Sequence, residues 1–180
     1  MKKIRHAGGY SIFELMFALT ILAILAAVAY PTIARARGAS IEVSTVASLR
    51  TILAAQAVYA ATCGQGFYAP SMRWLAQSGG SGRPAFIGPE FDGDIVDRSG
   101  YRIRFTPGAR AAIAPRTCNG LGAGQAVMDY FVAADPLETA GYPSHVRHFG
   151  TNPGGIVFES SKRVRLVYAG PPPPPAKPIK

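Results

Sequence analysis

The sequence predicts an α+β protein. One long N-terminal helix, whose first half is able to span a membrane, precedes a globular part built on an antiparallel sheet. The first observation behind this prediction is a helical pattern that continues from about Ser11 to Thr62. The second is a series of short alternating or apolar runs, bounded by Gly, Pro, Asn and Asp, in the C-terminal half. Strands that follow a helix, rather than alternate with helices, are typical of the α+β class.

The first part of the predicted helix is apolar enough for a membrane. The run from Ile12 to Ala29 contains one charged residue, Glu14, and a membrane-spanning helix needs about 17–25 residues. Basic residues Lys2, Lys3 and Arg5 precede it. Because positive charge marks the cytoplasmic side of a membrane segment, the N-terminus is expected in the cytoplasm.

Glu14 is the unusual residue of this apolar run. An ionised carboxylate at the centre of a membrane helix costs about 2.5–3.5 kcal/mol on insertion scales, so a partner is expected. Glu14 lies about one helical turn, or 3.6 residues, from Tyr10. The alternative is that Glu14 only extends to the nearby membrane surface and has no further role.

The N-terminal residues resemble the class III signal of type IV pilins and type II secretion pseudopilins. The shared features are a short basic leader ending at Gly9, the aromatic Tyr10, and a glutamate at position Glu14. The resemblance implies that a prepilin peptidase cleaves after Gly9 and methylates the new amino group of Tyr10. Glu14 would pair with the Tyr10 ammonium of a neighbouring subunit, which neutralises both charges in apolar surroundings and sets the axial register of an assembly.

Pro31 is similar in position to a proline of many type IV pilins. It cannot donate a hydrogen bond to the Ala27 carbonyl, so a helix kink is expected near it. Many of those pilins also have a glycine about eight residues earlier, where this chain has Ala23.

The resemblance also divides the chain. Residues 1–9 are the leader peptide, 10–37 the transmembrane half of the helix and future filament core, 38–170 a globular head of pilin fold, and 171–180 a proline-rich tail. The second half of the helix is expected to pack on the sheet, since its apolar residues follow helical spacing; a coiled coil is disfavoured because the heptads are not sustained. The tail is expected to be disordered, extended polyproline II.

Within the head, short runs predict the elements. Strands are expected over 101–106, 127–134, 146–149 and 156–159, with an edge strand or an extension over 164–168. A turn is expected over 97–100, and another over 152–155. A short helix is expected over 71–77, with Ser71 as its N-cap.

Two cysteines, Cys63 and Cys118, lie beyond the membrane segment. In an oxidising compartment two cysteines indicate one disulfide. Closing a loop of about 55 residues stabilises a protein by roughly 4 kcal/mol in the chain-entropy model. Two buried free thiols are the alternative.

The charge of the chain permits anionic partners without identifying one. Net charge is +9, and loss of the three basic leader residues lowers it to +6. The cluster Lys162, Arg163 and Arg165 is a candidate nucleic-acid contact, because phosphate binding needs such residues on one face. A solvated basic edge strand that resists aggregation is the alternative.

The sequence contains no motif typical of an enzyme. No nucleophile elbow, phosphate-binding loop or dinucleotide fingerprint occurs. His145 and His148 have no cysteine nearby, and Glu159 is the only acidic residue near the C-terminus, so neither a metal site nor a pseudopilin-like calcium loop is expected. We expect no cofactor, and we expect this protein to be a substrate of enzymes and not itself an enzyme.

Three functional hypotheses follow from the resemblance. The first is a structural subunit, major or minor, of a type IV pilus-like filament. The second is a type II secretion pseudopilin that forms a periplasmic pseudopilus, and the third is a DNA-binding minor pilin for DNA uptake. The expected partners are like or unlike pilin subunits, the prepilin peptidase and methyltransferase, and an inner-membrane assembly platform. The expected location is the inner membrane, as a single-pass protein, before assembly into an extracellular pilus or a periplasmic pseudopilus.

Overall fold

The computed structural model describes residues 11–78, 82, 84–137 and 147–179 and confirms the α+β class. The chain forms two compact units, Met1–Ala39 and Ser40–Lys180. One helix, α1 (Ile12–Thr62), begins in the first unit and ends in the second. The expected helix limits, 11 and 62, therefore match the observed ones closely.

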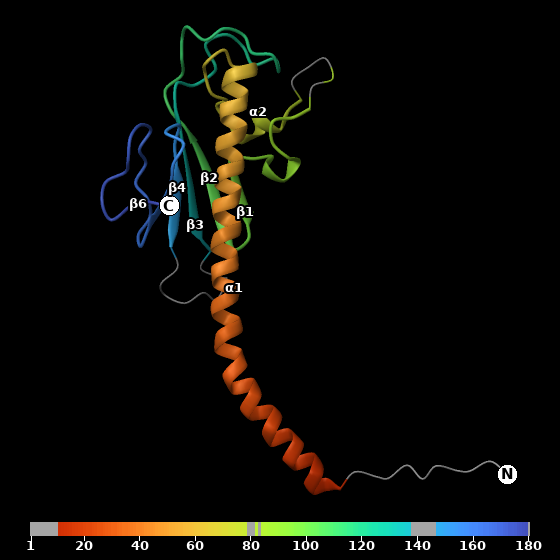
Figure 1. The fold of residues 1–180 in the computed structure, drawn as a ribbon. Helices are drawn as coiled ribbons and strands as arrows, with labels where there is room; N and C mark the ends of the chain where they lie inside the picture. The colour runs from red at the N-terminus through yellow and green to blue at the C-terminus, as the bar shows by residue number, and fades with distance from the viewer. Residues whose placement is uncertain (1–10, 79–81, 83, 138–146, 180) are drawn as a thin grey trace, which may run out of the picture. The chain divides into compact units, whose positions relative to one another are not determined.

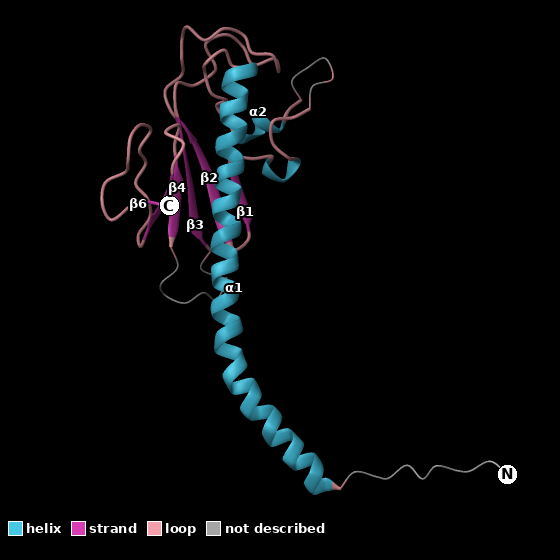
Figure 2. Cartoon of the chain, viewed as in Figure 1, coloured by secondary structure: helices cyan, strands magenta, loops and turns pink. Residues whose placement is uncertain are grey.

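The second unit is built on a six-stranded sheet whose neighbouring strands are antiparallel and follow chain order (Figure 2). The strands are β1 (Ile95–Arg98), β2 (Tyr101–Pro107), β3 (Tyr130–Pro136), β4 (His148–Thr151), β5 (Val157–Ser160) and β6 (Lys177–Pro178). Two short helical segments, α2 (Met72–Ala76) and η1 (Pro89–Phe91), lie between α1 and the sheet in the sequence. The Ser71 hydroxyl accepts a hydrogen bond from the Trp74 backbone N–H, which confirms the expected N-cap of α2.

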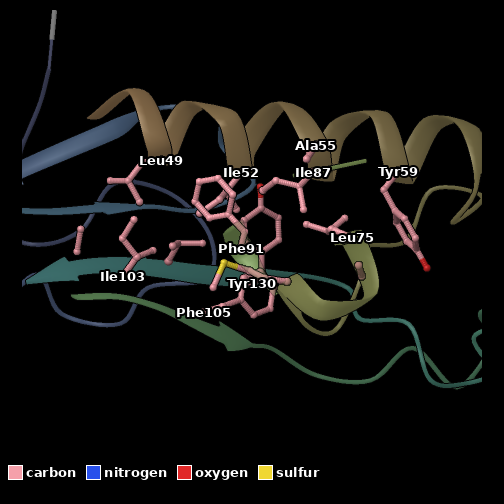
Figure 3. Close-up of a cluster of buried hydrophobic side chains, with 14 of the residues drawn as sticks. Leu49, Ile52, Ala55, Tyr59, Leu75, Ile87, Phe91, Ile103, Phe105 and Tyr130 are labelled. Atoms are coloured by element: carbon pink, nitrogen blue, oxygen red, sulfur yellow. The ribbon is translucent and has the colours of Figure 1, made fainter. Parts of the chain in front are cut away.

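The second half of α1 covers one face of this sheet (Figure 1). Figure 3 shows side chains of α1 pointing toward residues of the sheet. The buried residues of this core include Leu49, Ile52, Ala55 and Tyr59 from α1, and Ile103, Phe105, Tyr130, Val132 and Phe149 from the sheet. This arrangement explains the helical spacing of apolar residues in the second half of α1, because one stripe of the helix must meet the sheet.

The C-terminal end of α1 is held by a disulfide and by a buried amide. Cys63 and Cys118 are joined by a bond of 1.98 Å, which ties the loop before β3 to the end of the helix. Gln56 is fully buried, and its side chain donates to the Ala69 carbonyl and accepts from the Ala69 N–H, both at 2.9 Å. Both polar groups of the Gln56 amide are thereby satisfied away from water. Because Ala69 follows the chain reversal, these bonds hold the returning chain against the helix.

The strand β1 was not expected from the sequence, where only the turn after it was recognised. Ser99 and Gly100 have φ angles of 50° and 75° between the paired residues Arg98 and Tyr101. Two positive φ angles in a two-residue hairpin loop match the twist of the flanking strands. The hairpin therefore pairs residues 95–98 with β2, although that segment carries little apolar alternation of its own.

The expected strand over 127–134 is shifted toward the C-terminus in the structure. Val127 forms only isolated bridges, with Tyr68 and Arg110, whereas β3 continues through Asp135 to Pro136. The expected strand ends at residue 134, two residues before the observed end. Pro136 is compatible with the sheet because it is the last residue of β3, where a missing N–H donor costs the sheet at most one hydrogen bond. Of the expected strand over 146–149, residue 146 lies outside the described residues.

Of the two alternatives for residues 164–168, an edge strand or an extension, the edge strand does not form. Val164 is buried against the face of the sheet that lies opposite α1, where Phe131 and Gly150 also lie. The Tyr168 hydroxyl donates to the carbonyl of Pro107, at the end of β2, over 3.1 Å. The segment therefore crosses the outer face of the sheet, because burial of Val164 there outweighs pairing at the edge.

The proline-rich tail also differs from the expectation of a disordered segment. Within residues 171–179, Lys177 and Pro178 form β6 on the edge of β5, and Ile179 packs against the core. The side chain of Asn152 donates to the carbonyls of Val167 and Gly170, at 3.0 and 2.9 Å. These bonds fix the chain just before the tail, which then comes back to the sheet at β6. Composition alone does not predict that the tail comes back to the sheet, because five consecutive prolines favour an extended, solvated chain.

Candidate functional site

The first half of α1 is an apolar helix without a covering surface in the described chain. Every residue from Ser11 to Arg37 is exposed, and side chains such as Phe13 and Phe17 are 79% and 70% exposed. α1 is long and apolar enough to cross a membrane. Exposed apolar surfaces of this extent mark membrane or protein contacts, since they are costly in water.

Glu14 lies in the first turn of α1, among these exposed apolar side chains. Ser11 precedes the helix, and its hydroxyl accepts a hydrogen bond of 3.4 Å from the Phe13 N–H. A carboxylate in the first turn interacts favourably with the positive end of the helix dipole. Within the part of the chain that the structure describes, Glu14 has no ion-pair partner, so a partner would come from outside this part of the chain.

The two threonine hydroxyls of the apolar half are satisfied inside the helix. Thr20 donates to the Phe17 carbonyl and Thr32 donates to the Ala29 carbonyl, each at 2.7 Å. These bonds satisfy two polar groups that neither lipid nor a bundle of apolar helices would solvate. Glu14 is therefore the polar group of the membrane-length run that remains to be paired.

Two of the signal residues, Gly9 and Tyr10, lie outside the described residues. Pro31 lies inside α1, and the helix continues on both sides of it. A kink at Pro31 stays a prediction.

The sequence comparison bears directly on this end of the chain. Residues 4–30 match the family model of the prokaryotic N-terminal methylation motif. The chain carries a class III signal. This signal fits the type IV pilin and pseudopilin family, and the long apolar helix followed by an antiparallel sheet is a pilin-like layout. No curated protein and no solved structure matches the chain significantly.

The class III signal supports general conclusions about processing, location and protein class. Proteins with this motif are processed by prepilin peptidase and polymerise as pilins in general. The motif and the apolar helix together suit anchoring in the inner membrane before assembly. The class of proteins to which the motif belongs is structural and not enzymatic.

A network of ion pairs in the head links α1 to the edge of the sheet, and sequence reasoning missed it. Arg147, just before β4, pairs with Glu42 of α1 and with Glu159 of β5; its Nη1 lies 2.5 Å from Glu159 Oε2, and its Nε donates to Glu42 Oε2 over 3.0 Å. Lys177 of β6 adds a 3.4 Å pair with Glu159. The hydrogen bonds to Glu42 raise the pKa of the Arg147 guanidinium above its ordinary value. No local pattern indicates this network, because Glu159 and Glu42 lie 12 and 105 residues from Arg147 along the chain.

Replacement of Arg147 by alanine is expected to destabilise the head by about 2 kcal/mol. The side chains of Glu42 and Glu159 are only 17% and 13% exposed, so both would lose their shared counter-ion while still largely buried. Loss of one partner of a fully buried pair costs about 3–5 kcal/mol, and the half-exposed position of Arg147 reduces that figure. Chemical denaturation of the full chain in detergent would measure the change.

The matched control is Arg110→Ala, since Arg110 is exposed and forms no ion pair in the described chain. It should change the free energy of unfolding by less than about 0.5 kcal/mol. Equal stability of the two variants would contradict a structural role for the network.

The three basic residues singled out as a nucleic-acid contact lie in the segment that crosses the outer face of the sheet. Lys162, Arg163 and Arg165 are exposed, and the buried Val164 separates the two arginines. Nε of Arg163 lies 3.7 Å from a carboxylate oxygen of Asp135, so part of its charge is already compensated. The expected basic edge strand is absent from this segment, and the three side chains belong to a loop.

His148 has a structural partner in the sheet. Its Nδ1 lies 2.7 Å from Asp135 Oδ1, between the adjacent strands β4 and β3. No local sequence pattern indicates this pair, because Asp135 and His148 become neighbours only through strand pairing. His145 lies outside the described residues. Among the residues that the structure describes, no cluster of His, Cys, Asp and Glu could hold a metal ion.

Proposed function

We propose that this protein is a structural subunit of a type IV pilus-like filament, and that its function is polymerisation through the first half of α1. One observation carries the proposal: an exposed apolar helix of membrane length holds a carboxylate, Glu14, in its first turn, next to a class III signal. The helix would rest in the inner membrane until an assembly platform transfers it to the filament.

The physical reason for polymerisation is that neighbouring copies can cover what a single copy exposes. Bundling of the apolar halves would replace lipid around the helix, and each Glu14 would meet the Tyr10 ammonium of another copy. Contacts of this head-to-tail kind do not close on themselves, and they generate a helical polymer. The heads would then form the outer surface of the filament.

The experiment that tests processing is mass spectrometry of the mature N-terminus. The mature chain is expected to begin at Tyr10 and to carry one methyl group on its amino nitrogen. A Gly9→Leu variant, in which a bulky side chain stands at the cleaved bond, is expected to keep residues 1–9. A wild-type chain that retains the leader in the cell would contradict the proposal.

The same contacts between apolar helices could also build a secretion pseudopilus. The location of the protein distinguishes a pilus subunit from a pseudopilin. A pilus subunit is expected in the material sheared from the cell exterior, whereas a pseudopilin would stay in the periplasm. DNA capture finds less support, because the basic cluster is divided by Val164 and Arg163 is paired with Asp135.

A further inference from the structure

We propose that β6 is an exchangeable strand: it can leave its own sheet and occupy the same position on a second copy of this chain. The acceptor site is the edge of β5 together with a neighbouring pocket on α1. This inference concerns the head alone and goes beyond polymerisation through the apolar helix.

The acceptor edge recognises the C-terminal segment through its backbone and through charge. Lys177 pairs with Glu159, and the Ile179 N–H donates to the Val157 carbonyl over 2.9 Å. The Lys177 ammonium lies 3.4 Å from Glu159 Oε1. An extended segment that adds to a sheet edge gains affinity from such main-chain bonds and specificity from its side chains.

A pocket of about 440 Å³ beside this edge supplies the second part of the acceptor site. Val43 and Val46 of α1, Phe149 of β4 and the tail residue Ile179 are among its lining residues. Ile179 also packs against the main core. The acceptor therefore offers a carboxylate and an apolar wall to a segment that carries a cation followed, two residues later, by an apolar side chain.

The bonds that keep β6 on its own sheet are few. β6 contributes two paired residues, and one of them, Pro178, has no N–H to donate. The Ile179 N–H adds one more backbone bond to β5. Lys177 is 73% exposed, and exposed ion pairs contribute about 0–1 kcal/mol. Release of this strand should therefore require far less free energy than unfolding of the head.

The segment before β6 is suited to exchange. Residues 171–175 are prolines, and in the structure they must bend, with the Ala176 N–H donating to the Pro173 carbonyl over 3.3 Å. Figure 1 shows the blue C-terminal segment looping away from the sheet and returning at β6. Released polyproline extends by about 3.1 Å per residue, so residues 171–176 could carry the strand roughly 19 Å from Gly170.

Asn152 fixes the base of this arm, because its amide donates to the carbonyls of Val167 and Gly170. Of the five prolines that follow, Pro172 is buried and the other four are exposed, so release of the arm must also expose Pro172. Exchange keeps every contact of β6 and only changes the copy that supplies it, which makes it a low-cost route to association. Tethering of neighbouring copies raises the effective concentration of the arm to the millimolar range for short linkers.

The test uses full-length chains with cysteines placed on paired residues. A chain with Glu159→Cys is co-expressed with an epitope-tagged chain with Lys177→Cys, and isolated membranes are oxidised and run on non-reducing gels. Because the two cysteines lie on different chains, no internal bridge can join them, and a mixed dimer above the collisional yield of a control pair indicates exchange. We expect at least about tenfold more mixed dimer than from a control pair that combines Lys177→Cys with Arg116→Cys.

A second pair, Val46→Cys with Ile179→Cys, tests the pocket without removing the carboxylate of Glu159. Mixed dimers from both pairs, at yields above the control, would support exchange. Yields equal to the control for both pairs, with only an internal bridge when Glu159→Cys and Lys177→Cys are placed on one chain, would overturn it.

Discussion

Replacement of Glu14 by alanine is expected to leave membrane insertion intact and to reduce incorporation into the proposed filament at least tenfold. Removal of a charge makes the apolar helix easier to insert, since an ionised carboxylate opposes insertion. In the assembled state, however, each missing carboxylate would leave one Tyr10 ammonium unpaired among apolar helices. Loss of one partner of a buried ion pair costs about 3–5 kcal/mol, and about 1.4 kcal/mol corresponds to a factor of ten.

The measurement compares the amount of protein in sheared or purified filaments with the amount in membranes. Glu14→Gln keeps the size of the side chain and its hydrogen-bonding atoms but not its charge, so it should fail like the alanine variant. Thr20→Ala is the control, because the Thr20 hydroxyl bonds within its own helix. Normal filament yield from both Glu14 variants would exclude pairing of charges as the reason for this residue.

The parts of the fold that local chemistry determines could be predicted from the sequence. The limits of α1 and the cap of α2 follow from residue types within a few positions of each other. The strand β2 could also be predicted, because Tyr101, Ile103 and Phe105 alternate with exposed residues. Each of these signals is visible in a short window, since helix and strand periods are 3.6 and 2 residues.

The parts that were missed depend on contacts between distant residues. The segment around Val164 has the composition of a strand, yet it crosses the outer face of the sheet, where Gly150 leaves space: a Cβ atom at that position would lie 2.9 Å from the Phe131 ring. β6 exists because Glu159 and the neighbouring pocket provide a place for Lys177 and Ile179. No pattern within residues 171–179 carries this information.

The candidate site shows the same division. Glu14 was identified from the sequence because a carboxylate contradicts the apolar run around it, which is a local signal. The ion pairs of Arg147 in the head were not identified, because Glu42 lies 105 residues away along the chain. Tertiary structure was needed to show that a charged residue just before β4 connects the long helix to the edge of the sheet.

Replacement of Gly64 by alanine is expected to lower the stability of the head by about 3 kcal/mol. Gly64 is buried just after the end of α1, where its N–H donates to the Tyr59 carbonyl over 2.7 Å. A Cβ atom there would lie 2.1 Å from the backbone oxygen of Phe67 and 2.9 Å from the Tyr59 ring. The backbone oxygen cannot turn aside as a flexible side chain would, so the chain reversal next to the disulfide must move.

Thermal unfolding of the full chain in detergent measures this effect, and a loss of about 3 kcal/mol corresponds to a fall in Tm of roughly 6–12 °C for a domain of this size. The control is Gly38→Ala, because Gly38 lies inside α1 and a Cβ atom there would meet nothing within 4 Å. Alanine favours a helix interior by about 1 kcal/mol over glycine, so the control should lose no stability. A Gly64 variant as stable as the control would show that the reversal after α1 can relax, and that close packing of Gly64 against Phe67 does not hold the helix end in place.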